Sequence, residues 1–338
     1  MSNLPVLSVK NLKTGFQTES GMLLAVDDLS FDLFKGKTLG IVGESGCGKS
    51  VTSLSIMRLV PQPNGKILSG SIEFNGKNLL DLPLNQMRKI RGNQISMIFQ
   101  EPMTSLNPVF SIGNQIKEVI QLHQNLSKAE AQNKAIELLK LVGIPAPEKR
   151  INDFPYQLSG GMRQRIMIAM AIACDPDVLI ADEPTTALDV TIQAQILDLL
   201  RNLQSTLGMS LVLITHDLGV VAEMADDVMV MYAGQAVEYS SVKELFSNPS
   251  HPYTQGLLRS VPRISYGAIQ SADKSKKRLE TIPGIVPHLL NLPKGCRFQD
   301  RCQIAQDVCK KDDIPFEKLS VNSTHQTRCL FKGKGNNS

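Results

Sequence analysis

A chain of 338 residues is long enough for one large domain with an appendage or for two domains, and a hydrophobic fraction of 42% is ordinary for a globular protein. Its formal net charge of +4 is small, and no basic stripe with interleaved aromatic residues indicates nucleic acid as a partner. The longest nearly unbroken apolar run, residues 166–174, is too short to cross a bilayer, and the N-terminal residues lack the pattern of a signal peptide. We therefore expect a cytosolic protein that reaches a membrane only through a partner.

The N-terminal segment is expected to be rich in β-strands. Residues 6–10 and 29–33 alternate apolar and polar side chains, which is typical of half-buried strands. Phe16 stands just before a predicted loop at residues 17–21. Spacing alone leaves two interpretations of its ring open, namely stacking on an adenine base and packing in the core.

A phosphate-binding loop occupies residues 43–50, which read GESGCGKS and match the pattern G-x-x-x-x-G-K-[ST]. The loop follows a predicted strand at residues 38–42 and opens a predicted helix that runs from Lys49 to about residue 60, just before a proline. Glycines let such a loop aim its N–H groups at one anion, and the helix N-terminus adds its positive end. Lys49 is expected to reach the β- and γ-phosphates, and Ser50 to ligate Mg²⁺. A glycine turn that binds nothing is the alternative, and it does not account for four matched positions with both flanks correct.

Two further polar motifs lie in the middle of the chain. A predicted strand at residues 95–99 ends at Gln100, where α/β proteins place site residues, although most such glutamines only solvate a strand end. After residues 111–142, which are helical in pattern, residues 158–165 read LSGGMRQR and open another predicted helix. This helix start suits an anion but lacks the lysine of a phosphate loop. The chain thus has two helix starts suited to phosphate, but only the first has a lysine. This suggests that one nucleotide is bound between the first helix start of one chain and the second helix start of another.

Two carboxylates end the apolar strand predicted at residues 178–183. An aspartate such as Asp182 holds Mg²⁺ at this point in P-loop proteins, and Glu183 beside it is placed to act on water as a general base. The alternative of two solvated acids loses weight because the phosphate loop is in the same chain. The next predicted strand, residues 211–214, leads to His216, which suits a γ-phosphate but alone would more often be a structural residue.

Four of the six cysteines lie near the C-terminus, separated by five, six and nineteen residues: Cys296, Cys302, Cys309 and Cys329. Four thiolates suit a tetrahedral sulfur site for zinc or for an iron–sulfur cluster, although the spacing lacks the C-x-x-C pair of common zinc ribbons. Spacing leaves unligated thiols as the alternative. Residues 271–278, SADKSKKR, are expected to be a solvated linker.

Residues 43–50, Gln100, residues 158–165 and 178–183, Asp189 and His216 together resemble the ATP-binding subunit of an ABC transporter over roughly residues 5–260. The EPMTSLNP loop after Gln100, the HPYT at residues 251–254 and the cysteine tail resemble the branch that drives dipeptide and oligopeptide import, in particular its D-type subunit. The resemblance implies an α/β fold, a P-loop NTPase core with an N-terminal antiparallel β subdomain, a helical subdomain and a small cysteine-containing extension. It implies an ATPase domain at residues 1–260 and the extension at 261–338.

The resemblance also implies which residues hold ATP. Phe16 would stack on the adenine, and the partner subunit's ATP would be covered by Ser159, Gly160 and Gly161. The phosphates and Mg²⁺ would be held by the loop and its neighbours: Gly43, Glu44, Ser45, Gly46, Cys47, Gly48, Lys49, Ser50, Val51, Gln100 and Asp182. Within this set Ser50, Gln100 and Asp182 are the Mg²⁺ residues. Cys47 stands where many members of the family have serine or alanine, and we expect it to make the site sensitive to thiol reagents.

For catalysis, the resemblance implies that Glu183 is the base, that His216 contacts the γ-phosphate and that Gln100 links the site to the membrane partner. It implies two transmembrane permease subunits, a second and distinct ATPase subunit in an ATP sandwich, and an extracytoplasmic peptide-binding protein that acts indirectly. The protein is then expected at the cytoplasmic face of the cell membrane, with ATP, Mg²⁺ and a four-iron, four-sulfur cluster held by the four cysteines.

The implied function is ATP hydrolysis that powers peptide import. Import of another substrate such as nickel, and a soluble ABC ATPase without a transport role, remain alternatives. A phosphate-loop kinase or GTPase is disfavoured by the LSGGM element and by the Glu183–His216 pair, and no guanine-specifying N-K-x-D occurs.

Overall fold

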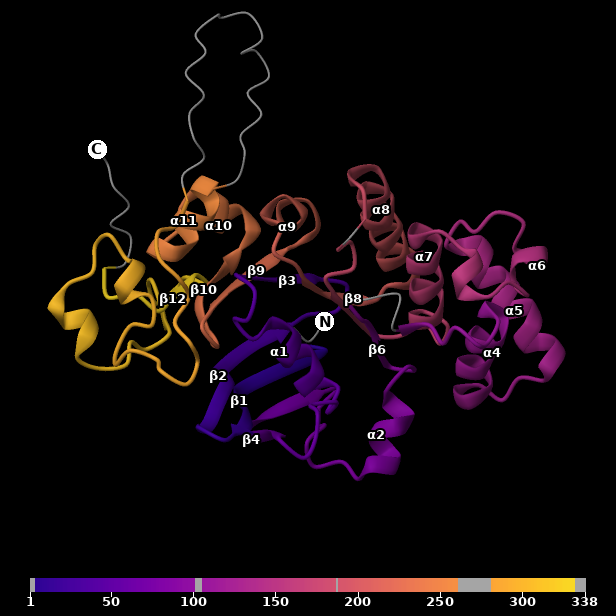
Figure 1. Ribbon diagram of the computed structural model, residues 1–338, viewed down its shortest axis with the longest axis horizontal. Helices are drawn as coiled ribbons and strands as arrows, with labels where there is room; N and C mark the ends of the chain where they lie inside the picture. The colour runs from indigo at the N-terminus through magenta and orange to yellow at the C-terminus, as the bar shows by residue number, and fades with distance from the viewer. Residues whose placement is uncertain (1–3, 101–104, 187, 261–280, 332–338) are drawn as a thin grey trace, which may run out of the picture.

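The computed structural model of this chain describes residues 4–100, 105–186, 188–260 and 281–331. An eight-stranded sheet within these ranges, in the order β11-β12-β10-β9-β3-β8-β7-β6, runs through the centre of the molecule (Figure 1). The strands from β9 to β6 are parallel, and they are short apolar runs because both faces of a parallel sheet are covered. Their bounds are β3 Thr38–Val42, β6 Ile95–Ile98, β7 Val178–Asp182, β8 Ser210–Ile214 and β9 Asp227–Tyr232.

A second, antiparallel sheet lies below the first in Figure 1, in the order β2-β1-β4-β5. It comprises β1 Leu7–Thr18, β2 Gly21–Leu33, β4 Gly65–Phe74 and β5 Lys77–Asn78. The strands predicted at residues 6–10 and 29–33 are thus confirmed within β1 and β2. The connection predicted at residues 17–21 is present but shorter than predicted, because β1 and β2 pair up to Thr18 opposite Gly21 and leave only a tight turn.

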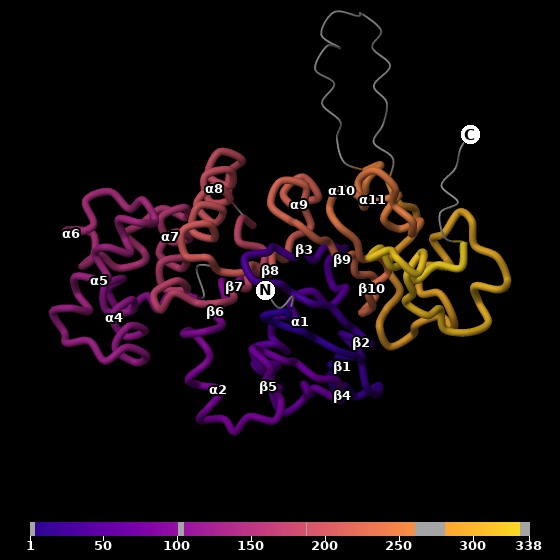
Figure 2. The backbone as a smooth tube through the Cα atoms, turned by 180° about the vertical axis from the view of Figure 1, so that it is seen from behind, coloured from indigo at the N-terminus to yellow at the C-terminus, as the bar shows by residue number. Residues whose placement is uncertain are grey.

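Helices α4 to α7 form a group at one end of the molecule, on the right in Figure 1 and on the left in Figure 2. Their bounds are α4 Ile112–His123, α5 Lys128–Leu141, α6 Pro147–Arg150 and α7 Gly160–Ala171. The helical pattern at residues 111–142 therefore corresponds to two helices. The break is due to Ser127, whose side chain accepts the N–H of Glu130 while Glu130 bonds back to the Ser127 N–H, a capping box that starts α5.

Helix α1, Lys49–Ile56, follows the phosphate loop and is shorter than the predicted helix to about residue 60. Arg58 adopts a left-handed conformation with φ of 51° just beyond its end. Arg91 caps the end, because its guanidinium donates to the carbonyls of Met57 and Arg58 at 2.7 and 2.8 Å. The remaining helices are α2 Leu84–Ile90, α8 Val190–Leu207, α9 Leu218–Met224, α10 Val242–Ser247 and α11 Pro252–Ser260. None of the helices described is long and apolar enough to cross a membrane.

Together, the parallel core, the antiparallel sheet and the helical group confirm the predicted α/β architecture. Buried apolar side chains join the antiparallel sheet to the central sheet in one cluster and the helical group to it in another. The predicted linker at residues 271–278 lies outside the described residues, and the predicted domain boundary adjoins the same gap.

Residues 281–331, called the C-terminal segment below, pack at the end of the molecule opposite the helical group (Figures 1 and 2). The segment adds β11 Glu317–Lys318 and β12 Gln326–Thr327 to the central sheet, where β12 pairs with β10 Gln235–Ser241. A third apolar cluster includes Phe298 from this segment with Tyr232 and Tyr253 from the core. The C-terminal segment is therefore joined to the core by both backbone and side-chain contacts.

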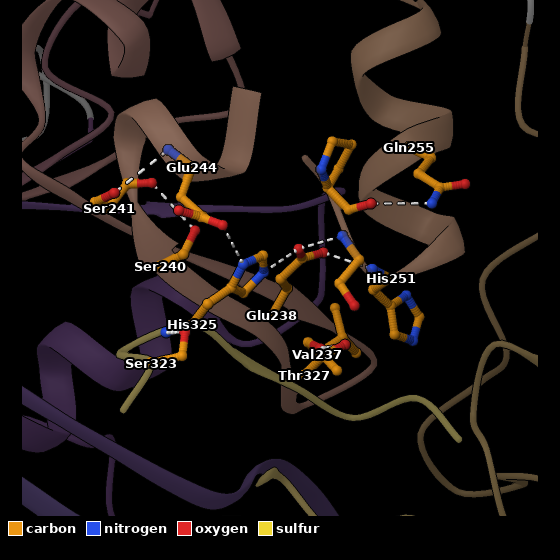
Figure 3. A network of polar contacts seen from close by, with 12 residues as sticks. Val237, Glu238, Ser240, Ser241, Glu244, His251, Gln255, Ser323, His325 and Thr327 are labelled. Carbon is orange, nitrogen blue, oxygen red and sulfur yellow. Dashed lines mark hydrogen bonds and ion pairs between the residues drawn. The ribbon is translucent and has the colours of Figure 1, made fainter. Parts of the chain in front are cut away.

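A buried carboxylate on β10, that of Glu238, contacts His325 of the C-terminal segment (Figure 3). The side chain of Glu238 is fully buried and accepts the backbone N–H groups of Ser250 and His251 at 2.6 and 2.8 Å. Its Oε1 also lies 2.7 Å from Nε2 of His325, whose Nδ1 is 3.6 Å from Oε1 of Glu244. Burial acts to lower the pKa of His325, but the hydrogen bond and charge of Glu238, aided by Glu244, prevail and raise it.

This pair predicts a pH dependence of stability. Because the pKa of His325 is higher in the folded chain than in the unfolded chain, its protonation stabilises the fold. This contribution is complete at pH values below the unfolded pKa of 6.5, and it is lost as the pH rises through the folded pKa. This pair makes stability fall between about pH 6 and about pH 8, whereas the buried His251, whose pKa is lowered to about 4, makes stability rise over the lower part of that range. We therefore expect the thermal unfolding midpoint of a His325→Gln variant to fall less, or rise more, with pH than that of the parent.

The matched control is His123→Gln, which alters a histidine whose pKa is lowered by burial. The lowered pKa makes stability rise with pH, so this variant should show a fall in the unfolding midpoint at least as large as the parental one, opposite in direction to the effect of His325→Gln. An equal fall in His325→Gln and in the parent would show that this pair does not control the pH dependence.

Candidate active site

The phosphate loop leaves β3 and enters α1 in a conformation that only glycine tolerates at two points. Gly43 and Gly48 have φ of 154° and 103°. A Cβ on Gly43 would lie 2.2 Å from the carbonyl oxygen of Met231, and one on Gly48 would lie 2.2 Å from that of Ala25. The loop is therefore pressed against β9 on one side and β2 on the other. Ser45 and Gly46 form its exposed rim, and Val51 packs against the core in α1.

Lys49 lies inside the curve of the loop with only 5% of its surface exposed. Its Nζ donates to the carbonyl oxygens of Gly43 at 2.8 Å and Glu44 at 3.2 Å. These contacts hold the ammonium group at the centre of the loop, where it can reach an anion bound by the N–H groups of the same loop.

A hydroxyl and a carboxylate meet beside the loop. The Oγ of Ser50, in the first turn of α1, donates to Oδ1 of Asp182 at 3.1 Å. Asp182 ends β7 and is 3% exposed, and burial raises the pKa of its carboxyl group, opposed by the Ser50 hydrogen bond. One alcohol and one carboxylate oxygen side by side are the hard ligands that Mg²⁺ prefers, so the residues present fit this ion.

Three polar side chains converge on one oxygen of Glu183. Its Oε2 accepts from Nε2 of Gln100 at 3.1 Å and from Oγ1 of Thr186 at 2.9 Å, and it lies 3.6 Å from Nδ1 of His216. Gln100, Glu183 and His216 follow β6, β7 and β8, so three parallel strands deliver them to one edge of the sheet. Glu183 has a positive φ of 48°, and its N–H is held by the carbonyl of Ile214 at 2.9 Å. Such a strained, fixed backbone is typical of functional positions.

Thr186 was not identified from the sequence. A turn from Glu183 to Thr186 brings the threonine hydroxyl to the Glu183 carboxylate. The only sign of this contact in the sequence is that Thr186 follows Glu183 by three residues. Asp189, part of the resemblance, caps α8 by accepting the N–H of Ile192 at 2.9 Å. Residues 101–104 of the loop after Gln100 lie outside the described residues.

The predicted adenine and partner residues lie apart from this site. Phe16 is half-buried in β1 between Leu23 of β2 and Gly65 of β4, and its role on an adenine stays a prediction. Ser159 caps α7 by accepting the N–H of Met162, and Ser159 and Gly160 are exposed. Both views place α7 away from α1 (Figures 1 and 2), so the LSGG element does not complete this chain's own loop.

All four C-terminal cysteines line one cavity together with apolar side chains, among them Phe298, Ile314 and Phe331. Burial, together with the charges of the neighbouring thiols, raises the pKa of Cys296 to about 11. Within the described part of the chain, no group of three or more His, Cys, Asp or Glu side chains is arranged to hold a metal ion. The four thiols thus line one cavity, but their arrangement does not support the predicted iron–sulfur cluster.

The surroundings of Cys47 argue against the expectation that it makes the site sensitive to thiol reagents. The side chain is fully buried beneath the loop, and burial raises the pKa of its thiol, which the nearby Lys49 ammonium opposes only in part. Little reactive thiolate is therefore present at neutral pH.

We accordingly predict that iodoacetamide does not label Cys47 in the native chain and labels it readily in denaturant. Mass spectrometry of the peptide that carries Cys47 measures both reactions in one sample. Labelling at comparable rates in the native and denatured chains would show that the loop opens far enough to expose the thiol.

Two family models match the chain. The model described as ABC transporter matches residues 26–186, and that of the oligopeptide/dipeptide transporter C-terminal region matches residues 237–309. A protein of Brucella melitensis biotype 1 named as a peptide import ATP-binding protein is 53% identical over 335 residues, 98% of each chain. A protein of Sinorhizobium fredii named as a peptide ABC transporter ATP-binding protein is 53% identical over 321 residues, 95% of this chain and 92% of the relative.

Solved structures agree with this family. A dimeric ATP-binding cassette in a post-hydrolysis state with ADP and phosphate aligns with a TM-score of 0.63 and 27% identity, over 70% of this chain and 98% of that one. Clostridium perfringens cbiO1, part of an ABC transporter complex, aligns with a TM-score of 0.60 and 27% identity, over 72% of this chain and 91% of that one. By sequence and fold, this chain belongs to the ATP-binding proteins of the ABC transporter family, in the group that carries the oligopeptide/dipeptide transporter C-terminal region.

Proposed function

We propose that this chain hydrolyses ATP to power the import of dipeptides or oligopeptides. The observation that carries the proposal is the convergence of Gln100, Thr186 and His216 on Glu183, next to the Ser50–Asp182 pair and the phosphate loop. Peptides are favoured over nickel because relatives that are about half identical over nearly the whole chain are named for peptide import.

The phosphate loop and Lys49 bind and orient the β- and γ-phosphates, and Ser50 and Asp182, with Gln100, hold Mg²⁺. The ion neutralises phosphate charge when bound. Glu183 orients the attacking water and accepts its proton. Its Oε2 is held by three neighbours, and none of the contacts described occupies its Oε1, which can therefore face the substrate. His216, with two-thirds of its side chain exposed, contacts the γ-phosphate. Phe16 stacks on the adenine.

A second ATPase subunit completes each site in this proposal. The start of α7, Ser159 to Gly161, covers the ATP of the partner, and the partner's equivalent segment covers Lys49 of this chain. Support comes from the exposure of Ser159 and Gly160 and from the dimeric form of the aligned cassette. We propose that the second ATPase is a distinct homologue and that the pair docks on two transmembrane permease subunits at the cytoplasmic face of the membrane. An extracytoplasmic peptide-binding protein delivers the substrate.

We further propose that residues 1–260 and 261–338 act as an ATPase domain and a C-terminal extension, and that the four cysteines of the extension hold a four-iron, four-sulfur cluster. The donor set supports the cluster, because four thiols line one largely apolar cavity. The ligands of a cluster bind different iron atoms, so they surround a larger volume than the ligands of a single ion.

The Glu183→Gln substitution tests the catalytic assignment. In proteoliposomes that contain the permease, the second ATPase and the binding protein, we expect ATP hydrolysis and peptide uptake to fall by roughly 100-fold or more. ATP binding should persist and should trap the two ATPase subunits together, because the nucleotide is held but not cleaved. Hydrolysis and uptake are measured as phosphate release and accumulation of labelled peptide.

The matched control is Glu223→Gln, which removes a carboxylate from an exposed ion pair with Arg201 and should leave both rates unchanged. Hydrolysis at the parental rate in Glu183→Gln would remove Glu183 from the mechanism. Uptake of nickel with no uptake of peptide would leave the ATPase intact and assign the other substrate.

Metal analysis tests the cluster. Protein purified without oxygen should contain about four irons and four acid-labile sulfides per chain, with a broad absorption band in the blue. Cys302→Ser should lower the iron content, and Cys174→Ser, a buried cysteine that does not line the cavity, should retain it. One zinc per chain, or no metal, would contradict the cluster and leave the ATPase proposal unchanged.

A further inference from the structure

Two side chains from distant parts of the chain hold the phosphate loop from behind. The hydroxyl of Tyr253, in α11, accepts the backbone N–H of Glu44 at 2.9 Å. Arg301 belongs to the 3₁₀ helix η3 (Gln299–Arg301) of the C-terminal segment and binds the Glu44 carboxylate with both of its terminal nitrogens. Nη1 lies 2.7 Å from Oε2 and Nη2 lies 3.0 Å from Oε1. A paired contact of this kind fixes both distance and orientation.

The guanidinium of Arg301 is itself immobilised. Its side chain is 5% exposed, and its Nε donates to the carbonyl of Pro283 at 2.9 Å. It lies 5.7 Å from the ring centre of Tyr232 and 5.8 Å from that of Phe298. Those aromatic rings in turn contact Tyr253. A planar group held at its edge and its face presents a rigid fork, which a lysine at this position would not provide.

Glu44 is the residue through which these contacts reach the loop. Its N–H is bonded to Tyr253, its carboxylate to Arg301, and its carbonyl oxygen to Nζ of Lys49 at 3.2 Å. A rotation of the Glu44 peptide would therefore displace the lysine that binds phosphate. A loop that is already in its binding conformation loses less entropy when the ligand arrives, so a brace of this kind raises affinity.

We propose that Arg301 and Tyr253 are positioning residues for the phosphate loop, which act through Glu44, so that the C-terminal segment sets the affinity of this chain for nucleotide. This inference rests on the proposed binding of ATP at the loop. It differs from a purely structural role, in which Arg301 would only attach the C-terminal segment to the core and nucleotide affinity would not depend on it.

The chain offers a matched control in the same segment. Arg328 is also buried, also precedes a cysteine, and lies 3.7 Å from Asp28 of β2 while donating to the carbonyls of Ala236 and Ile314. No contact between Arg328 and the phosphate loop exists among the described residues. Arg328→Gln therefore loosens the segment without touching Glu44.

The test is the affinity of the full chain for MgADP, measured by isothermal titration calorimetry, because ADP occupies the loop without hydrolysis. We expect Arg301→Gln and Glu44→Gln each to raise Kd about five- to tenfold, and the double variant to be no weaker than the weaker single variant. Arg301→Lys should resemble Arg301→Gln, and Tyr253→Phe should raise Kd about two- to threefold. In the assembled transporter, KM for ATP should rise while kcat stays within about twofold.

Arg328→Gln should lower the unfolding midpoint and leave Kd within about twofold of the parent. An unchanged Kd in Arg301→Gln, or an equal rise in Arg328→Gln, would overturn the inference, as would additive effects of Glu44→Gln and Arg301→Gln. If Arg301→Gln fails to fold, Glu44→Gln and Tyr253→Phe decide the question alone, and normal Kd in both would overturn it. Absence of MgADP binding by the parent chain would instead refute the proposed nucleotide site.

Discussion

The arrangement of the site depends on one constraint, the parallel register of three neighbouring strands. Ile214 of β8 lies opposite Ile41 of β3 on one side and opposite Asp182 of β7 on the other. The chain therefore leaves β3 for the phosphate loop at the level where β7 delivers its carboxylates. Without that register, Ser50 and Asp182 would not meet at 3.1 Å, and Glu183 would not lie beside His216. Backbone hydrogen bonds of the sheet thus decide the positions of side chains that are more than 130 residues apart in the sequence.

The C-terminal segment docks on the core through four cationic side chains, each of which meets a carboxylate of the core. Arg297 pairs with Asp27, Arg301 with Glu44, His325 with Glu238, and Arg328 approaches Asp28. The most buried of these pairs, Arg297–Asp27 and His325–Glu238, lose much of their attraction to desolvation, so they are weak evidence for stability. Their geometry is specific, however, and they leave the segment few alternative ways to dock. Apolar contacts around Phe298 then supply the hydrophobic part of the interface.

Three of these cations adjoin cysteines of the cavity in the sequence: Arg297 follows Cys296, Arg301 precedes Cys302 and Arg328 precedes Cys329. The cavity and the docking contacts are thus built from the same short stretches of chain. The sequence suggested that the C-terminal segment is a separate appendage, but its Arg301 also holds Glu44 of the phosphate loop. Arg301 can connect the two because its guanidinium donates both to the Pro283 carbonyl within the segment and to the Glu44 carboxylate of the loop.

The sequence by itself determined the local features. The phosphate loop between strand and helix, the serine cap of α7 and the carboxylates at the end of β7 all follow from contacts among residues close in the chain, so their patterns are legible without the fold. The convergence on Glu183 was only partly predictable, because Thr186 reaches it through a turn that no motif marks. Tertiary structure decided the rest. Cys47 is buried because the loop packs it against the core. The end of α1 is capped by Arg91, which follows the last residue of α2. Arg301 and Glu44 are in contact although 257 residues separate them. Contacts at such separations arise from packing, which local sequence patterns do not encode.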